Sequence, residues 1–178
     1  MALVITGKST CKICNKVMTE DDTLIMFPPF VANLKDPVYF FNDEAFHDAC
    51  FQTHPLANRA LALRELFEAA TANRLCHISQ KPVSAPEGGI FIPLITSDEN
   101  EELYKFDFMC FDRNNISNWN EREYFIETMN RFKAEDKWRD RPGYEFFDRF
   151  LKNLNEPVIR FGSHLTQAKE IQPGFSSG

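Results

Sequence analysis

The sequence predicts an α+β fold built from two tandem units of similar design, followed by C-terminal helices. Three observations support this: a Cys-x2-Cys pair matched by a later His-x2-Cys pair, an internal similarity at the constant offset that carries Cys11 onto Cys76, and helical periodicity after Asn118. A chain of 178 residues is long enough for one domain or two small ones. We expect a metal-binding unit with a long helix at 1–75, a degenerate copy at 76–117, a helical region at 118–160 and a flexible tail at 161–178.

The first unit contains patterns for two strands and one long helix. "TLIMF" at 23–27 and "PVYFF" at 37–41 are rich in β-branched and aromatic residues, which favours strands. Apolar residues at spacings of three and four then predict a helix, and Pro55 suits its first turn. The helical stripe consists of Leu56, Ala60, Leu63, Phe67 and Ala70.

The second unit and the C-terminal region follow a similar order. "GGIFIPLI" at 88–95 and "ELYKFDF" at 102–108 predict strands, separated by an acidic loop. Asn118 or Asn120 can cap a helix that runs to about Asp140, where Arg-Pro-Gly interrupts the pattern. A second helix is predicted over 144–154.

Cys11, Cys14, His47 and Cys50 have the residue types and spacing of a metal site. Zinc in structural sites takes four ligands in a tetrahedron, and a pair of the type Cys-x2-Cys can bind one ion from a single turn. A Cys3His set fills all four positions and leaves none for a catalytic water. We therefore expect one structural Zn²⁺ ion and no enzymatic activity.

This ligand pattern resembles the treble-clef zinc-finger group, which includes the LIM-type fingers, over residues 11–63. The resemblance implies that the first cysteine pair lies on a knuckle and the second ligand pair at the start of a helix after a hairpin. The chain departs from LIM fingers in two respects: the segment between Cys14 and His47 is longer than their usual loop, and no further ligand pair follows Cys50 at once. Treble-clef folds also include HNH-type nucleases, but the paired histidine pattern that such enzymes need is missing from the hairpin segment.

A second copy of this unit is predicted from the internal similarity. The spacing between Cys11 and Cys76 defines its repeat offset, and the identities at that offset are Cys11 with Cys76, Ile13 with Ile78, Lys16 with Lys81, Ile25 with Ile90, Pro28 with Pro93, Tyr39 with Tyr104 and Phe41 with Phe106. A five-residue deletion would then align Asp107 with His47 and Cys110 with Cys50. Cys76, Asp107 and Cys110 thus form a candidate degenerate second site, and we expect it to be metal-free because Ser79 replaces a cysteine.

Charge and composition limit the partners that we expect. The net charge of −6 and the pI near 5.3 count against nucleic acid, which requires a basic footprint. No stretch approaches the roughly 18 apolar residues of a membrane span, and "MALVITGKST" at the start lacks a signal-peptide pattern. We expect a cytoplasmic protein, in which five cysteines favour metal binding or free thiols over disulfides. No motif for a small-molecule substrate is evident.

The predicted function is a non-catalytic, zinc-stabilised protein-interaction protein. Seven acidic residues and a single lysine lie between Thr19 and Asp48, which suggests an inhibitor or immunity-type antidote that binds a basic partner enzyme. The alternatives are a nucleic-acid-binding regulator or HNH-like nuclease on a treble-clef finger, and a structural subunit of a larger assembly. Candidate partner-binding residues are Asp21, Asp22, Phe27, Phe30, Tyr39, Asp43 and Glu44.

Overall fold

A computed structural model describes residues 2–83 and 88–155, so the tail expected at 161–178 lies outside the described residues. The strands are β1 (Leu24–Met26), β2 (Ala45–His47), β3 (Gly89–Phe91) and β4 (Cys110–Asp112). The α-helices are α1 (Asp48–Gln52), α2 (Ala57–Asn73), α3 (Arg122–Ala134) and α4 (Phe146–Asn155). Short 3-10 helices are η1 (Pro37–Phe41), η3 (Tyr104–Phe106) and η4 (Arg113–Asn118).

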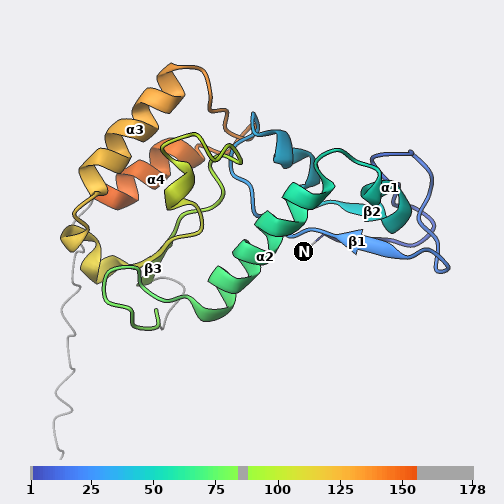
Figure 1. The fold of residues 1–178 in the computed structure, drawn as a ribbon, viewed down its shortest axis with the longest axis horizontal. Coiled ribbons are helices and arrows are strands. Elements are labelled where there is room, and N and C mark those ends of the chain that lie inside the picture. The colour runs from blue at the N-terminus through green and yellow to red at the C-terminus, as the bar shows by residue number, and fades with distance from the viewer. Residues whose placement is uncertain (1, 84–87, 156–178) are drawn as a thin grey trace, which may run out of the picture.

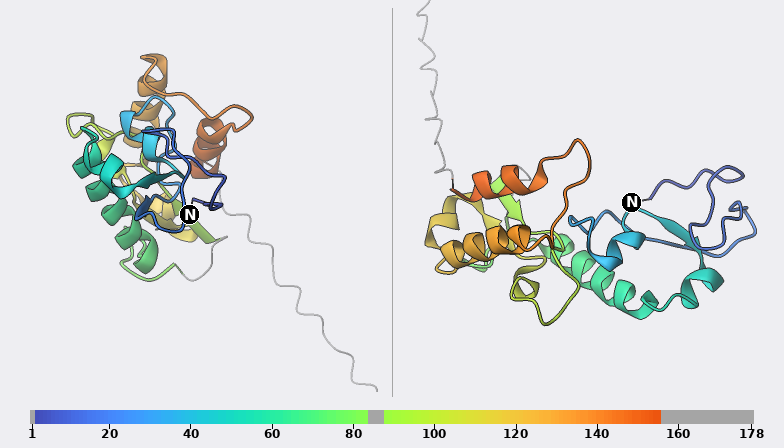
Figure 2. Two further views of the ribbon diagram at one scale, coloured as in Figure 1. Left: turned by 90° about the vertical axis from the view of Figure 1, so that its right-hand side faces the viewer. Right: turned by 90° about the horizontal axis from the view of Figure 1, so that it is seen from above.

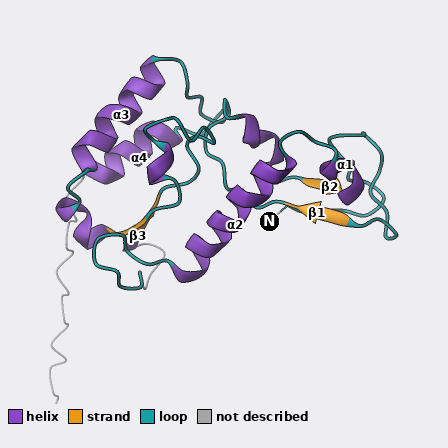
Figure 3. Cartoon of the chain, in the orientation of Figure 1, coloured by secondary structure: helices purple, strands orange, loops and turns teal. Residues whose placement is uncertain are grey.

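The elements gather at two ends of an elongated molecule. Strands β1 and β2 and helix α1 lie at one end, and helices α3 and α4 lie at the other (Figure 1). Helix α2 runs from the first end toward the second, as the view from above in Figure 2 also shows. Helices and two small antiparallel sheets are mixed along the chain (Figure 3), which is compatible with the predicted α+β class.

Both sheets are two-stranded hairpins with the same register. In the first, Leu24 lies opposite His47, and in the second, Gly89 lies opposite Asp112. Strand β3 follows β1, and β4 follows β2, at the same repeat offset that relates Cys76 to Cys11. The five-residue deletion predicted from the sequence is therefore wrong. It would shift β4 by five residues relative to β2, whereas β4 keeps the same offset as β3.

Helix α2 forms where the apolar stripe predicted it. Ala60 and Leu63 are fully buried, and Phe67 packs on the same core. The helix ends at Arg74, whose left-handed backbone (φ 35°) closes the last turn with a hydrogen bond to Ala70. The apolar face of α2 therefore covers the first core.

The segment predicted as a strand at 37–41 is instead the 3-10 helix η1. The Asp36 side chain accepts a hydrogen bond from the Val38 amide, and Pro37 occupies the first helical position, where its missing N–H costs nothing. The strand predicted at 102–108 is likewise largely replaced by η3 and the turn after it. Packing of the aromatic side chains decided the backbone here, against their preference for strands.

The described residues form two hydrophobic cores. The first is built mainly from residues 11–63 and includes the buried rings of Phe27, Phe30, Phe41, Phe46 and Phe51. The second is built from residues 90–154 and contains both tryptophans, Trp119 and Trp138. Residues from the predicted 76–117 and 118–160 segments share this second core.

Asn33 connects the two halves of the molecule. Its side chain is 2% exposed, and its amide nitrogen donates to the carbonyls of Ile95 (3.2 Å) and Lys137 (2.9 Å). Its amide oxygen accepts from the backbone N–H groups of Lys35 (3.0 Å) and Arg139 (3.1 Å). One buried side chain thus uses all four of its hydrogen-bonding positions.

Within the described residues, the helices are too short or too polar to cross a bilayer.

Asn42 and Asp107 hold corresponding turns, but only Asp107 can ionise. The Asn42 side-chain oxygen accepts from the amides of Phe30 (2.8 Å) and Val31 (2.7 Å), and Asp107 Oδ1 accepts from the amide of Ile95 (2.7 Å). Oδ2 of Asp107 is buried without a hydrogen-bond partner. Burial, with the charge of Asp36 nearby, raises the pKa of Asp107 well above its usual value.

We predict that Asp107→Asn stabilises the protein at neutral pH. An acid whose pKa is raised by folding contributes its full stability below the unfolded pKa near 3.8, and that contribution is lost as pH rises toward the folded pKa. Urea unfolding at saturating zinc, from pH 5 to pH 8, should therefore show a growing stability advantage of the variant over the wild type.

Asn42→Asp is the matched control and should introduce a loss of stability of the same sign as pH rises. Parallel pH profiles for wild type and Asp107→Asn would show that the Asp107 carboxyl is ionised in both states.

Candidate metal centre

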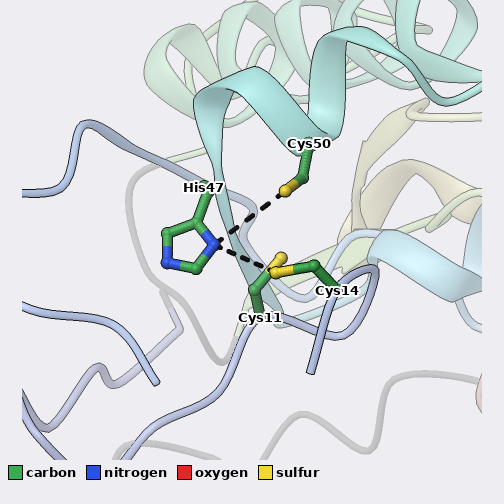
Figure 4. A group of neighbouring side chains, drawn as sticks. All are labelled: Cys11, Cys14, His47 and Cys50. Atoms are coloured by element: carbon green, nitrogen blue, oxygen red, sulfur yellow. Dashed lines mark hydrogen bonds between the residues drawn. The ribbon is translucent and has the colours of Figure 1, made fainter. Parts of the chain in front are cut away.

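Cys11, Cys14, His47 and Cys50 meet in the fold as the sequence predicted. One ligand atom from each lies within 4.8 Å of every other (Figure 4). The first two come from the turn near the N-terminus, His47 ends β2, and Cys50 lies in α1. The cluster could hold a metal ion, and the donor set is consistent with zinc.

The turn that carries the first pair is shaped by its backbone. The Asn15 amide donates to the Cys11 carbonyl (2.7 Å), and the Cys11 amide donates to the Lys16 carbonyl (2.9 Å). Asn15 adopts the left-handed conformation (φ 59°), which asparagine tolerates better than most residues. This tight turn places both sulfurs on the side that faces His47.

Two of the donor separations are close to those of a tetrahedral zinc shell. His47 Nδ1 lies 3.4 Å from Cys14 Sγ and 4.0 Å from Cys50 Sγ. With Zn–S near 2.3 Å and Zn–N near 2.0–2.1 Å, tetrahedral angles give an N···S separation of about 3.6 Å. The observed separations lie on either side of that value.

The His47 ring directs Nδ1 toward the sulfurs of Cys14 and Cys50 (Figure 4), so Nδ1 is the atom that would bind a metal. The other ring nitrogen, Nε2, lies 3.4 Å from the Asp22 carboxylate. Asp22 is itself fixed by the Thr19 amide (2.7 Å) and the Thr19 hydroxyl (2.8 Å). A carboxylate on the second nitrogen fixes the tautomer and makes the ligand more basic, as in many metal sites.

The pKa values of the clustered thiols show which deprotonation a bound cation would favour. Burial acts to raise the pKa of Cys11, but the amides of Cys14, His47 and Ile13 outweigh it and lower the pKa to about 7. The pKa of Cys50 is raised to about 11 by a hydrogen bond with Cys14, by burial and by the adjacent thiolates. A second proton is therefore hard to remove unless a cation offsets the charge.

The cysteines of the second half do not form an equivalent cluster. Among the described residues, Cys76, Asp107 and Cys110 are not brought together with a metal-binding geometry. Asp107 faces the Ile95 amide, and Cys110 lies in β4 opposite Phe91. The roles predicted for Asp107 and Cys110 depended on the five-residue deletion that the strand register contradicts.

Some of the candidate partner-binding residues are buried and others are exposed. Phe27 and Phe30 are 0% exposed, so their prediction as contact residues was wrong. Tyr39 is half-buried beside a cavity of about 300 Å³, and Glu44 pairs with Lys12 (2.9 Å). Asp21 and Asp43 are exposed, whereas Asp22 is half-buried at the metal site.

The sequence alone did not predict that Asp22 contacts His47, a member of the metal cluster. This aspartate lies in a run of three acids, Glu20, Asp21 and Asp22, and only the fold shows which of them reaches His47. The signal in the sequence that could have distinguished Asp22 is the Thr-x-x-Asp spacing, which allows the Thr19 amide and hydroxyl to donate to the Asp22 carboxylate.

Comparison of the chain with protein-family models, with curated proteins and with solved structures finds no match.

We predict that Asp22→Asn lowers zinc affinity about 10–100-fold, because loss of an outer-shell carboxylate weakens the His47 ligand. The neighbouring Asp21→Asn removes one charge of the same sign from an exposed side chain and should leave affinity nearly unchanged. Competition with a chromophoric chelator at constant pH measures both. Equal losses for the two variants would mean that Asp22 acts only through general charge.

Proposed function

We propose that this chain is a non-catalytic protein-interaction protein whose N-terminal half is a treble-clef-like unit closed by one structural zinc ion. The observation that carries the proposal is the convergence of three cysteine sulfurs and one imidazole nitrogen within 4.8 Å. The order of turn, hairpin and helix around them supports the treble-clef assignment. Cytoplasmic residence, where free thiols persist, accords with five unpaired cysteines.

The composition of the ligand set favours a structural role for the metal. Catalytic zinc keeps one position for water or substrate, whereas here four protein side chains supply the four positions of a tetrahedron. Structural zinc contributes roughly 10–16 kcal/mol of apparent free energy in small fingers, which is comparable with the net stability of a domain. The ion would thus fix the first turn to the hairpin and to α1.

The distribution of charge favours a basic protein partner over nucleic acid. Three basic residues of the C-terminal helical region are engaged in ion pairs: Arg131 with Glu102, Lys133 with Asp148, and Lys137 with Glu101 and Glu135. Near the metal site, in contrast, Glu20 and Asp21 are exposed. We therefore propose that the zinc-bearing end meets a basic protein, as an inhibitor or immunity-type antidote would.

For the metal, we predict one zinc per purified chain by elemental analysis. Cys14→Ala should abolish it and unfold the first unit, because three ligands cannot close the shell. Cys110→Ala, which removes a thiol outside the cluster, is the control and should retain one zinc. A wild-type protein that folds and stays folded without zinc would overturn the structural role.

For the partner, we predict that a protein captured by this chain from its native extract is basic and associates more slowly as salt rises, by about tenfold or more between low and high ionic strength. Glu20→Lys/Asp21→Lys should slow association further. Glu123→Lys/Glu127→Lys makes the same charge change on exposed positions of α3 and is the control. An association rate independent of salt and of both variants would contradict the proposed surface.

A further inference from the structure

We infer that residues 74–83 and 88–134 repeat the first unit at one constant offset, and that Cys76, Ser79, Asp112 and Asn115 occupy the four ligand positions of a second, latent zinc site. Each of these positions follows a member of the metal cluster at the repeat offset: Cys76 follows Cys11, Ser79 follows Cys14, Asp112 follows His47 and Asn115 follows Cys50. This inference rests on the proposed zinc at the first site. It gives a different residue set from the one that a gapped alignment of the sequence suggests.

The turn at Cys76 has the same hydrogen bonds as the turn at Cys11. The Gln80 amide donates to the Cys76 carbonyl (2.8 Å), and the Cys76 amide donates to the Lys81 carbonyl (2.9 Å). Gln80 has the same left-handed backbone as Asn15, its counterpart in the first turn, with φ 56° and 59° respectively. An isolated antiparallel β-bridge flanks each turn: Thr10 pairs with Val17 in the first, and Leu75 pairs with Pro82 in the second.

The amides that surround the two sulfurs also correspond. Hydrogen bonds from the backbone of Cys14, His47 and Ile13 reach the Cys11 sulfur. Those that reach the Cys76 sulfur come from the backbone of Ser79, Asp112 and Ile78, which are their counterparts at the repeat offset. Cys76 is therefore placed against Ser79 and Asp112 as Cys11 is placed against Cys14 and His47.

The elements that follow keep the same offset. His47 precedes α1 with an extended backbone (φ −60°, ψ 133°), and Asp112 precedes η4 with nearly the same angles (φ −73°, ψ 125°). The first residues of α2 and α3 are likewise separated by the repeat offset. Their preceding residues, Leu56 and Glu121, have almost identical angles (φ −96°, ψ 7° and φ −94°, ψ 7°).

Local hydrogen bonds take up the side chains where the second unit lacks ligands. The Ser79 hydroxyl bonds to the Cys76 sulfur. The Asp112 carboxylate accepts from the Asn114 amide (2.8 Å) and so caps η4, a role that the His47 side chain does not have in α1. Ser79 and Asp112 thus have hydrogen-bond partners without a metal, in a backbone frame similar to that of the first site.

Helix α4 supplies packing that the first unit lacks. Its buried residues Phe147, Phe150, Leu151 and Leu154 belong to the second core, together with the counterpart helix α3. A larger core can replace the constraint that an ion imposes, because each large apolar side chain removed from water adds to the stability of the folded state. This accounts for a second unit that folds with one cysteine at the turn.

The test is to restore three ligands. Ser79→Cys/Asp112→His/Asn115→Cys, expressed with zinc in the full chain, should raise the metal content from one to two zinc ions per chain. Substitution of Co²⁺ should double the thiolate-to-metal absorption relative to the wild type. Emission from Trp119 and Trp138, which lie in the second core, reports whether that unit is folded.

Ser79→Cys/Asp107→His is the matched control. With the native Cys76 and Cys110 it offers the ligand set of the five-residue deletion, and it should stay at one zinc. The two-substitution variant Ser79→Cys/Asp112→His should bind a second ion more weakly.

A folded triple variant with one zinc would overturn the inference, as would a control that binds two. Failure of both the triple and the double variant to fold in zinc would also overturn it, since a restored shell should stabilise the unit. If the wild type itself held no zinc, the proposed function would fail instead, so the two failures are distinguishable.

Discussion

Three thiols and an imidazole held within 4.8 Å are the constraint around which the N-terminal half is organised. Cys11 and His47 are far apart in sequence, and the β1–β2 hairpin and the first turn of α1 are what bring them together. Such a cluster is unfavourable by itself, because ionised sulfurs at this distance repel one another. A divalent cation bound by the four side chains would convert that repulsion into attraction.

The surroundings of the cluster are consistent with this role. Asp22 orients the His47 ring from outside, and Thr19 holds Asp22 from two directions. The densely packed rings of the first core, in which Phe27, Phe41 and Phe51 contact one another, belong to the same buried cluster as Cys11. The hairpin is therefore fixed both by polar contacts around the cluster and by aromatic packing.

Much of this arrangement could be predicted from the sequence, for identifiable reasons. The ligand set could be found because zinc binding allows few residue types at few spacings. Helix α2 could be found because its apolar residues recur at helical spacing over several turns. The 3-10 helix at Pro37–Phe41 was missed because aromatic composition was given more weight than the Asp-Pro start signal. The register of β4 was missed because so short a strand carries too little pattern to place it. Burial of Phe27 and Phe30 could not be predicted because the sequence pattern of an aromatic residue is the same in a core and at an interface.

The Asn33 side chain has a mechanical consequence for recognition. One buried amide fastens the chain before η1 to the segments around Ile95 and Arg139, so a hinge motion between the two cores would have to break these hydrogen bonds. A binding partner that meets this joined form loses less free energy to ordering of the chain than it would with two independently moving halves.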